Sequence, residues 1–473
     1  MPDERAGTSG DRPKNSAEQR RALANELRLL ALGGEVNQRP GAPRHRRQPA
    51  KRPRRWGRVA AISAIAVVVV VGGVTGGGYL YARYRFSQIP KMKVHHISYP
   101  VPGQPFNILS IGSDSRSGLS PKVAQETGAT GVSGQRSDVV KIIHVDPVHK
   151  TITMLSIPRD TVVTLLANQS LYGKFNRINV NYANGPSLLA QTITANFGIP
   201  INHVMQVSFG GLINAAEAVG GVYLDFPTTA HDVLSGLAIT HPGCQLVNGF
   251  QALALARSRH YLYSPTNRPF PKGGALLYQN GNLSALAAEG WYYDGTSDYG
   301  RIIRQNAFLR AMFARVKGSL DNPLRINSFL ANLPAGVSID STFTFNEMIG
   351  LALKFHSYNT ATMQTYTLPN YPGLLGGADV LFVQEPQTQE LLTQIFGTSL
   401  RRPTNPPPIP SGATPQPPVI AVTTTTVARA TTTAHSPKSG KKHTSTTTTT
   451  HPVTTTTNPS QAAPSYDPVP CTP

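Results

Sequence analysis

Five short motifs along the chain combine arginine with aspartate or another polar residue. They are GSDSR (112–116), RSD (136–138), IPRD (157–160), RSR (257–259) and DYGRIIRQ (298–305). Arginine carries a planar guanidinium that stays charged and presents its N–H groups as a fork, which matches the oxygens of a phosphate group. Several such forks that converge on one point would bind a diphosphate.

Two of these motifs also supply carboxylates, Asp114 and Asp138, which would repel a diphosphate. A divalent cation between them resolves the conflict, because Mg²⁺ takes one or two carboxylates together with phosphate oxygens and water. The sequence therefore predicts an Asp–Mg²⁺–diphosphate–Arg arrangement, with Mn²⁺ as the alternative metal. The signatures GxxxxGK[ST], HExxH and GxSxG are absent, which excludes P-loop enzymes, zinc metallopeptidases of that type and nucleophile-elbow hydrolases.

The spacing within two motifs places their polar side chains together. Arg257 and Arg259 lie two residues apart, so they share a face if the backbone is extended. Asp298, Arg301 and Gln305 follow helical i, i+3, i+7 spacing and share one helix face. Each motif alone also fits an ordinary ion pair, and Asp298 fits a helix cap. The joint occurrence of all five favours a binding site.

The elements that must position these motifs alternate between strand and helix patterns over residues 105–400. Apolar alternation predicts a hairpin of strands 139–145 and 151–157 around Asp146–Pro147. Residues 106–111, 204–207 and 222–226 read as further strands, and 212–219, 301–316 and 385–396 as helices. We predict an α/β fold, an α-β-α layered domain with a central mixed sheet. Several motifs lie at predicted strand ends, where such folds place their sites.

A transmembrane helix precedes this domain. Residues 59–82 contain no charged side chain and are long enough to cross a bilayer. Eight lysine and arginine residues lie between Arg44 and Arg58 without an acidic residue, which predicts a cytoplasmic N-terminus and an extracytoplasmic main domain. We expect a mostly disordered basic segment over 1–58 that rests on the cytoplasmic membrane, and a linker over 83–104. The alternative is a tail that binds nucleic acid. No interleaving of aromatic residues with the basic ones supports this alternative.

The formal charge of +20 is unevenly distributed, and the two ends are compositionally unusual. Residues 1–58 carry +9 and residues 401–473 carry +5. From residue 403 the chain holds 20 threonines and 15 prolines, so we predict a disordered tail over 401–473. The chain's 2 cysteines are Cys244 and Cys471, and the compartment permits a bond between them. The sequence favours neither a bond nor free thiols.

The order of the motifs resembles the LytR-CpsA-Psr family of cell-wall proteins. The resemblance runs through NILSIGSDSR, RSDVVKIIHVDP, TMLSIPRD, KFNRINVNYANG, GIPINHVMQVSFGGL, AVGGVYLDF, LVNGFQALALARSRH and DYGRIIRQNAFL, from residue 107 to 313. It implies a membrane-anchored phosphotransferase that moves a glycopolymer from a polyprenyl-diphosphate carrier onto peptidoglycan. The expected partners are therefore that lipid-linked polymer, peptidoglycan and the membrane, with no nucleic acid.

The resemblance also implies residue roles. Asp114 and Asp138 match the carboxylates associated with Mg²⁺. Diphosphate-binding arginines correspond to Arg136, Arg159, Arg257, Arg259 and Arg301, and Gln305 matches a polar residue beside the head group. We expect Asp138, Arg257 and Arg301 to serve catalysis, with Asp138 or Asp298 accepting the proton of the acceptor hydroxyl. Further motif positions without a firm role are Arg116, Asp160, Lys174, Asn179, Asp298 and Arg304.

Two insertions depart from the family pattern, a Gly/Ser-rich stretch at 117–135 and an aromatic-rich stretch at 260–297. The second is either a lid that stacks on sugars or a loop that closes its own small core. If it displaced Asp298 and Arg301, the site would be broken. Three other functions stay open: a pyrophosphatase, a non-catalytic binder of lipid-linked polymer, and a DNA-binding regulator, which requires the opposite topology. The identity of the wall polymer also stays open.

Overall fold

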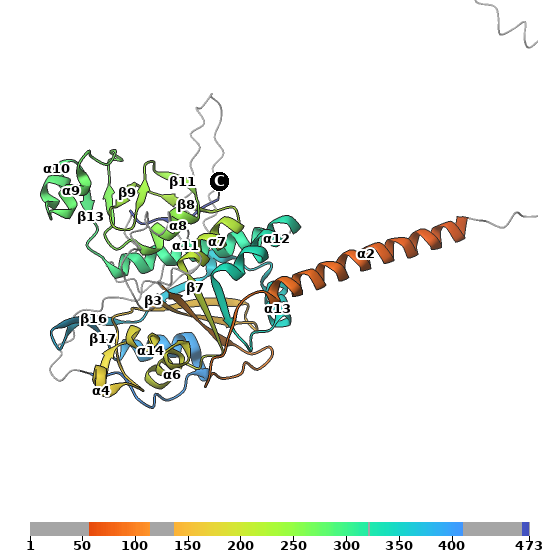
Figure 1. The fold of residues 1–473 in the computed structure, drawn as a ribbon, viewed down its shortest axis with the longest axis horizontal. Coiled ribbons are helices and arrows are strands. Elements are labelled where there is room, and N and C mark those ends of the chain that lie inside the picture. The colour runs from red at the N-terminus through yellow and green to blue at the C-terminus, as the bar shows by residue number, and fades with distance from the viewer. Residues whose placement is uncertain (1–55, 114–136, 320–321, 410–465, 473) are drawn as a thin grey trace, which may run out of the picture. The chain divides into compact units, whose positions relative to one another are not determined.

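The computed structural model describes residues 56–113, 137–319, 322–409 and 466–472 (Figure 1). The chain divides into two units, Met1–Val71 and Gly72–Pro473, and the second contains the folded domain. The predictions for residues 1–55, for the insertion at 117–135 and for residues 410–465 lie outside the described residues.

Helix α2 (Trp56–Ser87) contains the predicted membrane segment and extends beyond it. By length and composition, residues Ser63–Ser87 form one helix that is apolar enough to cross a membrane. In the second unit, Phe86 near the end of α2 packs with Val337 and Phe345. The predicted linker at 83–104 therefore includes ordered structure: the end of α2, and strand β1 (Lys91–Met92), which pairs with β14.

A seven-stranded mixed sheet with the order β1-β14-β7-β2-β3-β4-β15 forms the centre of the second unit. The predicted hairpin is the antiparallel pair β3–β4, and β2 pairs with β3 on one side and runs parallel to β7 on the other. The layered α/β class with a mixed sheet is confirmed. The strands are β2 (Phe106–Ser113), β3 (Ser137–Asp146), β4 (Thr151–Ile157), β7 (His203–Ser208), β14 (Val337–Asp340) and β15 (Gln364–Thr367).

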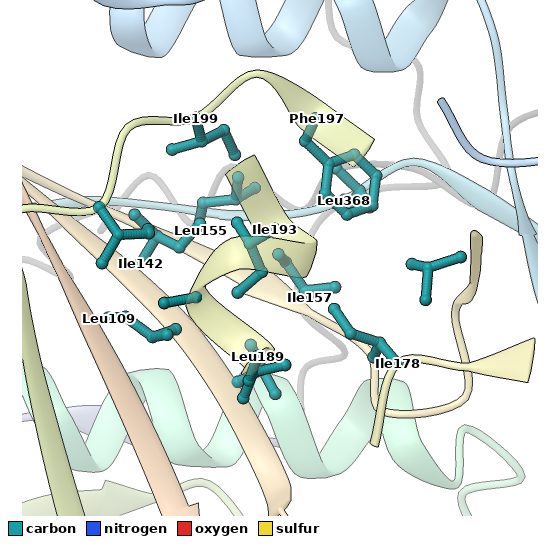
Figure 2. Packing of buried hydrophobic residues seen from close by; sticks show 14 of the residues in the cluster. Leu109, Ile142, Leu155, Ile157, Ile178, Leu189, Ile193, Phe197, Ile199 and Leu368 are labelled. Atoms are coloured by element: carbon teal, nitrogen blue, oxygen red, sulfur yellow. The ribbon is translucent and has the colours of Figure 1, made fainter. Parts of the chain in front are cut away.

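One face of the sheet packs against α6 (Pro186–Phe197) and α14 (Gln387–Phe396), which lie on the same side in Figure 1. Because side chains alternate along a strand, every second residue of β2, β3 and β4 points to this face. Leu109, Ile142 and Leu155 are in register and fully buried here, and Figure 2 shows them beside Leu189 and Ile193 of α6. This apolar cluster fixes the sheet register, since a one-residue slip would expose it.

The opposite face carries the other set of side chains and is covered by α11 (Asp298–Ser319) and α13 (Phe345–Phe355). Ile143 and Met154 pack there with Phe313 of α11 and Leu351 of α13. Two layers of helices thus enclose the sheet, and the arginine-bearing helix α11 lies on this second face.

The predicted strand–helix–strand order at 204–226 is confirmed as β7, α7 (Phe209–Ala218) and β8 (Val222–Phe226). Ser208 ends the strand and caps α7, because its hydroxyl accepts a hydrogen bond from the N–H of Gly211 at 3.1 Å. Smaller elements complete the domain: β5 (Val162–Thr164), α4 (Gln169–Tyr172), β6 (Phe175–Arg177), α5 (Asn179–Tyr182), α8 (Gly249–Arg257), α12 (Pro323–Asn332), β16 (Asn370–Leu375), β17 (Ala378–Val383), and 3₁₀ turns at Leu333–Ala335, Thr360–Thr362 and Gly397–Ser399.

The aromatic-rich stretch at 260–297 closes its own small core. Leu262, Leu286 and the indole of Trp291 are buried together, and Phe270 and Tyr278 pack against them. This confirms the structural alternative over the lid. Its elements are β12 (Leu262–Ser264), α9 (Gly274–Gln279), α10 (Leu283–Ala288) and β13 (Tyr292–Tyr293), and its two strands join β9 (Thr229–Asp232) and β10 (Leu237–Ile239) in a four-stranded sheet. Strand β11 (Gly243–Val247) pairs with β8 instead.

The C-terminal residues belong to the folded domain, contrary to the predicted disordered tail over 401–473. Strand β18 (Val469–Pro470) pairs with β8, and Cys471 forms a disulfide with Cys244. At the other end of the predicted tail, the N–H of Arg401 donates to Gly198 O at 2.8 Å. Composition is an average over the segment, so it did not reveal these two short anchored ends.

Candidate active site

A cavity of about 310 Å³ lies between the second face of the sheet, α7, the end of α8 and α11. Much of its wall is apolar, and one part of it is strongly positive. Four arginines and a lysine line it together with the carboxylate of Asp232. The charged residues, the histidine and the glutamine that line the cavity are Lys141, Arg159, Asp232, Arg257, Arg259, His260, Arg301 and Gln305.

Arg257 and Arg259 reach the cavity because α8 ends between them. The helix begins with a capping box, in which Asn248 and Gln251 bond each other's backbone N–H groups. Arg257 is its last residue, and its guanidinium lies 5.3 Å from the ring centre of Phe209, another cavity residue. Both arginines line the cavity, although Arg257 belongs to the helix and only Arg259 follows the extended Ser258, so the predicted continuous extended backbone does not occur.

Asp232 holds the turn that carries Arg259. This carboxylate is fully buried at the end of β9, and its Oδ2 accepts from the Ser258 hydroxyl at 2.7 Å and from the His260 N–H at 2.9 Å. Both residues that flank Arg259 are therefore tied to one carboxylate. Asp232 was not among the predicted site residues, because in sequence it lies far from RSR and resembles an ordinary turn aspartate.

Helix α11 supplies Arg301 and Gln305 from its first turns, as the spacing predicted. Both side chains are buried, and Gln305 Nε2 donates to Ala256 O of α8 at 2.7 Å. The helix approaches the preceding loop closely at Gly300, where an added Cβ would lie 2.1 Å from Thr296 Oγ1. A larger residue there would have to displace the side chains of Thr296, Arg304 and Asp294.

Arg304 does not line the cavity. Its guanidinium is fully buried and donates to Asp294 at 2.9 Å, to Asp467 at 2.8 Å and to the Ser258 carbonyl at 3.2 Å. These carboxylates, together with Tyr261 beneath it, hold the pKa of Arg304 above its ordinary value despite burial. Arg304 therefore joins α11, the RSR turn and the C-terminal segment, which makes it a positioning residue.

Asp298 forms ion pairs with three arginines. Its Oδ1 lies 2.5 Å from Arg259 Nε and 3.3 Å from Arg301 Nη2, and its Oδ2 lies 3.6 Å from Arg159 Nε. The carboxylate side chain is only 13% exposed. It therefore gathers guanidinium groups from three separate segments to one point, as the convergence of motifs predicted.

Arg159 follows β4 in the IPRD motif. Its Nε lies 3.3 Å from Asp160, which also pairs with Arg177 at 3.4 Å. The N–H of Asn179 donates to the Arg159 carbonyl at 3.3 Å, so Asn179 supports this loop. Lys174 does not join the site: it is exposed, with its ammonium 5.3 Å from the ring centre of Phe175.

The remaining predicted residues fall at the ends of β2 and β3. Asp114, Arg116 and Arg136 lie outside the described residues, and for Asp138 only the backbone in β3 is described. Ser113 pairs with Ser137 and Gly112 with Val139, so the described end of β2, one residue before Asp114, lies beside the start of β3, which contains Asp138. Two carboxylates suit Mg²⁺. No group of three or more potential ligands (His, Cys, Asp or Glu) exists in the part of the chain that the structure describes.

Lys141 is a cavity residue that the motifs did not reveal. It lies on β3 in register with Ser110 and Ser156 and is only 2% exposed. The available signal was a charged residue inside the apolar run VVKIIHV, which reads as a strand buried on both faces.

Comparison with known proteins identifies relatives of this chain. A sequence model of the LytR_cpsA_psr family matches residues 83–268 and 287–396. The probable cell wall biosynthesis protein LcpB of Corynebacterium glutamicum is 31% identical over 230 residues, which covers 48% of this chain and 46% of that protein. The polyisoprenyl-teichoic acid–peptidoglycan teichoic acid transferase TagV of Bacillus subtilis is 24% identical and covers 70% of this chain and 75% of TagV.

This chain thus spans about half the length of LcpB, or 46%. Among solved structures, a LytR-Csp2A-Psr enzyme from Actinomyces oris superposes with a TM-score of 0.48 at 17% identity. That match covers 68% of this chain and 99% of the other.

Proposed function

This chain belongs to the LytR_cpsA_psr family, and we propose that it is a membrane-anchored phosphotransferase that moves a glycopolymer from a polyprenyl-diphosphate carrier onto peptidoglycan. The observation that carries the proposal is the cavity, where four arginines face apolar walls. A lipid diphosphate has the same two characters, an anionic head and an apolar chain. The name of TagV, a transferase that joins teichoic acid from a polyisoprenyl carrier to peptidoglycan, agrees with this chemistry.

The arginines would bind the diphosphate and stabilise the charge that develops on the leaving polyprenyl phosphate. An acceptor hydroxyl attacks the phosphorus that bears the glycopolymer, the bond from this phosphorus to the bridging oxygen breaks, and that oxygen leaves with the polyprenyl phosphate. Asp298 already lies among the arginines and would take the hydroxyl proton; Asp138 is the alternative base. The product is a phosphodiester between polymer and peptidoglycan.

We infer that Asp114 and Asp138 would hold Mg²⁺ or Mn²⁺, which would neutralise phosphate charge when bound. Support comes from the β2–β3 register, in which Ser113, the residue before Asp114, pairs with Ser137, the residue before Asp138. The ion pairs of Asp298 with Arg159, Arg259 and Arg301 form without the metal.

The proposed topology has a cytoplasmic N-terminus and an extracytoplasmic domain. Two observations support it: the basic residues before α2, and the disulfide between Cys244 and Cys471, which belongs to oxidising compartments. The enzyme and its lipid substrate would then meet in the same membrane. An alkaline phosphatase fusion at the C-terminus should be active; activity only of a cytoplasmic reporter at that position would refute the topology.

Two other functions remain as alternatives: a polyprenyl-diphosphate pyrophosphatase, and a non-catalytic binder of lipid-linked polymer. The full chain in detergent, incubated with lipid-linked glycopolymer, peptidoglycan fragments and Mg²⁺, separates them. Glycopolymer attached to peptidoglycan supports the transferase. Hydrolysis that frees the glycopolymer from its lipid at the same rate with and without peptidoglycan would establish the pyrophosphatase. Binding of the lipid-linked polymer without any reaction would establish the non-catalytic binder.

A further inference from the structure

Lys141 lies at the centre of the sheet on the face that forms the cavity floor. Its register neighbours on β2 and β4 are Ser110 and Ser156, so three polar side chains form one row across the sheet. The next row on the same face contains Ile143 and Met154, which belong to the apolar core. The polar row therefore separates the core from the cavity, and Lys141 is its cationic member.

The hydrogen-bond partners of Lys141 are neutral. Its Nζ donates to Ser156 Oγ at 2.7 Å and to Asn306 Oδ1 at 2.6 Å. An ammonium has three N–H donors and needs a counter-charge when it is buried. No carboxylate of the described residues forms an ion pair with Lys141, although the side chain is almost fully buried. Among the described residues, Lys141 is thus a cationic group in the cavity floor without a carboxylate partner.

Lys141 lies among the arginines of the site. Lys141, Arg159, Arg301 and Gln305 line both the main cavity and a second, smaller cavity beside it. Burial, and after it the positive charge of Arg301, lower the pKa of Lys141 to about 7. Near neutral pH, Lys141 of the ligand-free protein is therefore a mixture of amine and ammonium.

We propose that Lys141 is part of the diphosphate site, and that it takes up a proton from solvent when the lipid-linked diphosphate binds and then serves as its counter-ion. The proposal rests on the proposed function of the cavity and deepens it. The phosphate oxygens would supply the missing counter-charge, while Ser156 and Asn306 hold the amine in place. No bond of the lipid substrate is made or broken in this step. One proton moves from solvent to the Nζ amine and forms the third N–H bond of the ammonium.

Other charged groups also face this part of the cavity. Arg301 comes from α11, Arg159 from the loop after β4, and Arg257, Arg259, His260 and Asp232 from the segments around α8 and β9. The arginines stay charged throughout the relevant range. Histidine is the other residue type that titrates near neutrality, so His260 requires its own control.

The probe is farnesyl-diphosphoryl glucose, whose two phosphates are both esterified and therefore do not titrate near pH 7. Calorimetric titration of the full chain, in two buffers of different ionisation enthalpy, measures the protons taken up per molecule bound. A group with a pKa near 7 predicts uptake of about 0.9 proton at pH 8 and about 0.1 at pH 6. The affinity should fall up to about tenfold per pH unit above pH 7.

The Lys141→Met variant should bind the probe more weakly than the wild type below pH 7. It should show neither the proton uptake nor the pH dependence of the affinity. Arg310→Met is the matched control, because Arg310 is another buried cation of the same face, on α11, that donates to Thr365 and does not line the cavity. It should keep the proton uptake. His260→Gln should keep it as well, and if it alone removes the uptake, the proposal is wrong.

The wild-type titration keeps the test open if Lys141→Met fails to fold. Binding of the probe without proton uptake at pH 8 would overturn the role of Lys141 and leave the proposed function intact. Absence of any binding to the wild type, or binding unaffected by Arg257→Ala, would count against the proposed function itself. The two failures are therefore distinguishable.

Discussion

Asp298 is the internal counter-ion of three arginines of the site, so replacing it with asparagine should have opposite effects on stability and on diphosphate binding. The carboxylate lies within 3.6 Å of nitrogens from Arg159, Arg259 and Arg301. Asparagine preserves the shape and removes the charge. Three guanidinium groups would then face one another without compensation.

The expected loss of stability follows from burial and distance. A pair of charges about 4 Å apart interacts with about 4 kcal/mol at an effective dielectric constant of 20, before desolvation is subtracted. The side chains of Asp298 and Arg301 are 13% and 6% exposed, whereas that of Arg259 is 33% exposed and its pair is partly screened. We therefore expect a net loss of about 2–3 kcal/mol, which lowers the melting temperature by about 4–8 °C.

Diphosphate binding should change in the other direction. An anionic ligand replaces the missing carboxylate, so Asp298→Asn should bind farnesyl-diphosphoryl glucose about tenfold more tightly, and the ligand should raise its melting temperature more than that of the wild type. Transfer should nevertheless fall if Asp298 accepts the proton. Thermal unfolding and calorimetry, each with and without the ligand, measure these effects.

The matched control is Asp160→Asn. Asp160 is 18% exposed and also pairs with Arg159, but its second partner, Arg177, does not line the cavity, whereas all three arginine partners of Asp298 do. This variant should lose stability without gaining affinity for the ligand. If Asp298→Asn were as stable as the wild type, or bound the diphosphate more weakly, the assignment of Asp298 as counter-ion would be refuted.

Three further predictions concern the site and the segments that support it. Arg257→Ala should lower affinity for the lipid diphosphate about 10–100-fold in calorimetry while leaving the melting temperature within a few degrees, because lost charge-assisted hydrogen bonds are worth roughly 1.5–3 kcal/mol; unchanged affinity would contradict its placement. The double variant Cys244→Ser, Cys471→Ser, or reduction of the disulfide, should lower the free energy of unfolding by about 2–5 kcal/mol, because the disulfide no longer closes a long loop of the unfolded chain. Equal denaturant midpoints of the variant and the wild type would show that the C-terminal anchor is dispensable. For Lys141, the folded pKa of about 7 lies below the ordinary lysine pKa of 10.5, so the unfolded chain binds more protons between these pH values. This group therefore makes stability rise with pH across that window. Lys141→Met should lose that part of the rise, and an unchanged slope would contradict the shifted pKa.

The sequence could predict most of the fold because its signals were local. Alternation over 139–157 marked the hairpin, and the i, i+3, i+7 spacing from Asp298 to Gln305 marked the helix face that reaches the cavity. The described arginines of IPRD, RSR and DYGRIIRQ line one cavity, as expected of a positive cluster that draws residues from several segments to bind an anion, whereas Arg116 and Arg136 lie outside the described residues.

Long-range partners could not be predicted in the same way. Asp232 supports Arg259 through the turn backbone, and Asp467 reaches Arg304 from a C-terminal segment that composition assigned to disorder. No spacing rule links residues so far apart in sequence. Lys141 was visible as a charge in an apolar strand, but only the register with Ser156 and the contact with Asn306 show that it faces the cavity.

The central claim is that the arginine-lined cavity holds a lipid diphosphate for transfer of the phosphate that bears the glycopolymer. The most direct measurement uses lipid-linked glycopolymer with ³²P in that phosphate, the full chain, peptidoglycan fragments and Mg²⁺. The proposed mechanism predicts that the label becomes covalently attached to peptidoglycan together with the polymer, and that Arg301→Ala abolishes this attachment. Label that stays with the polyprenyl phosphate, or label released to water equally well without acceptor, would contradict it.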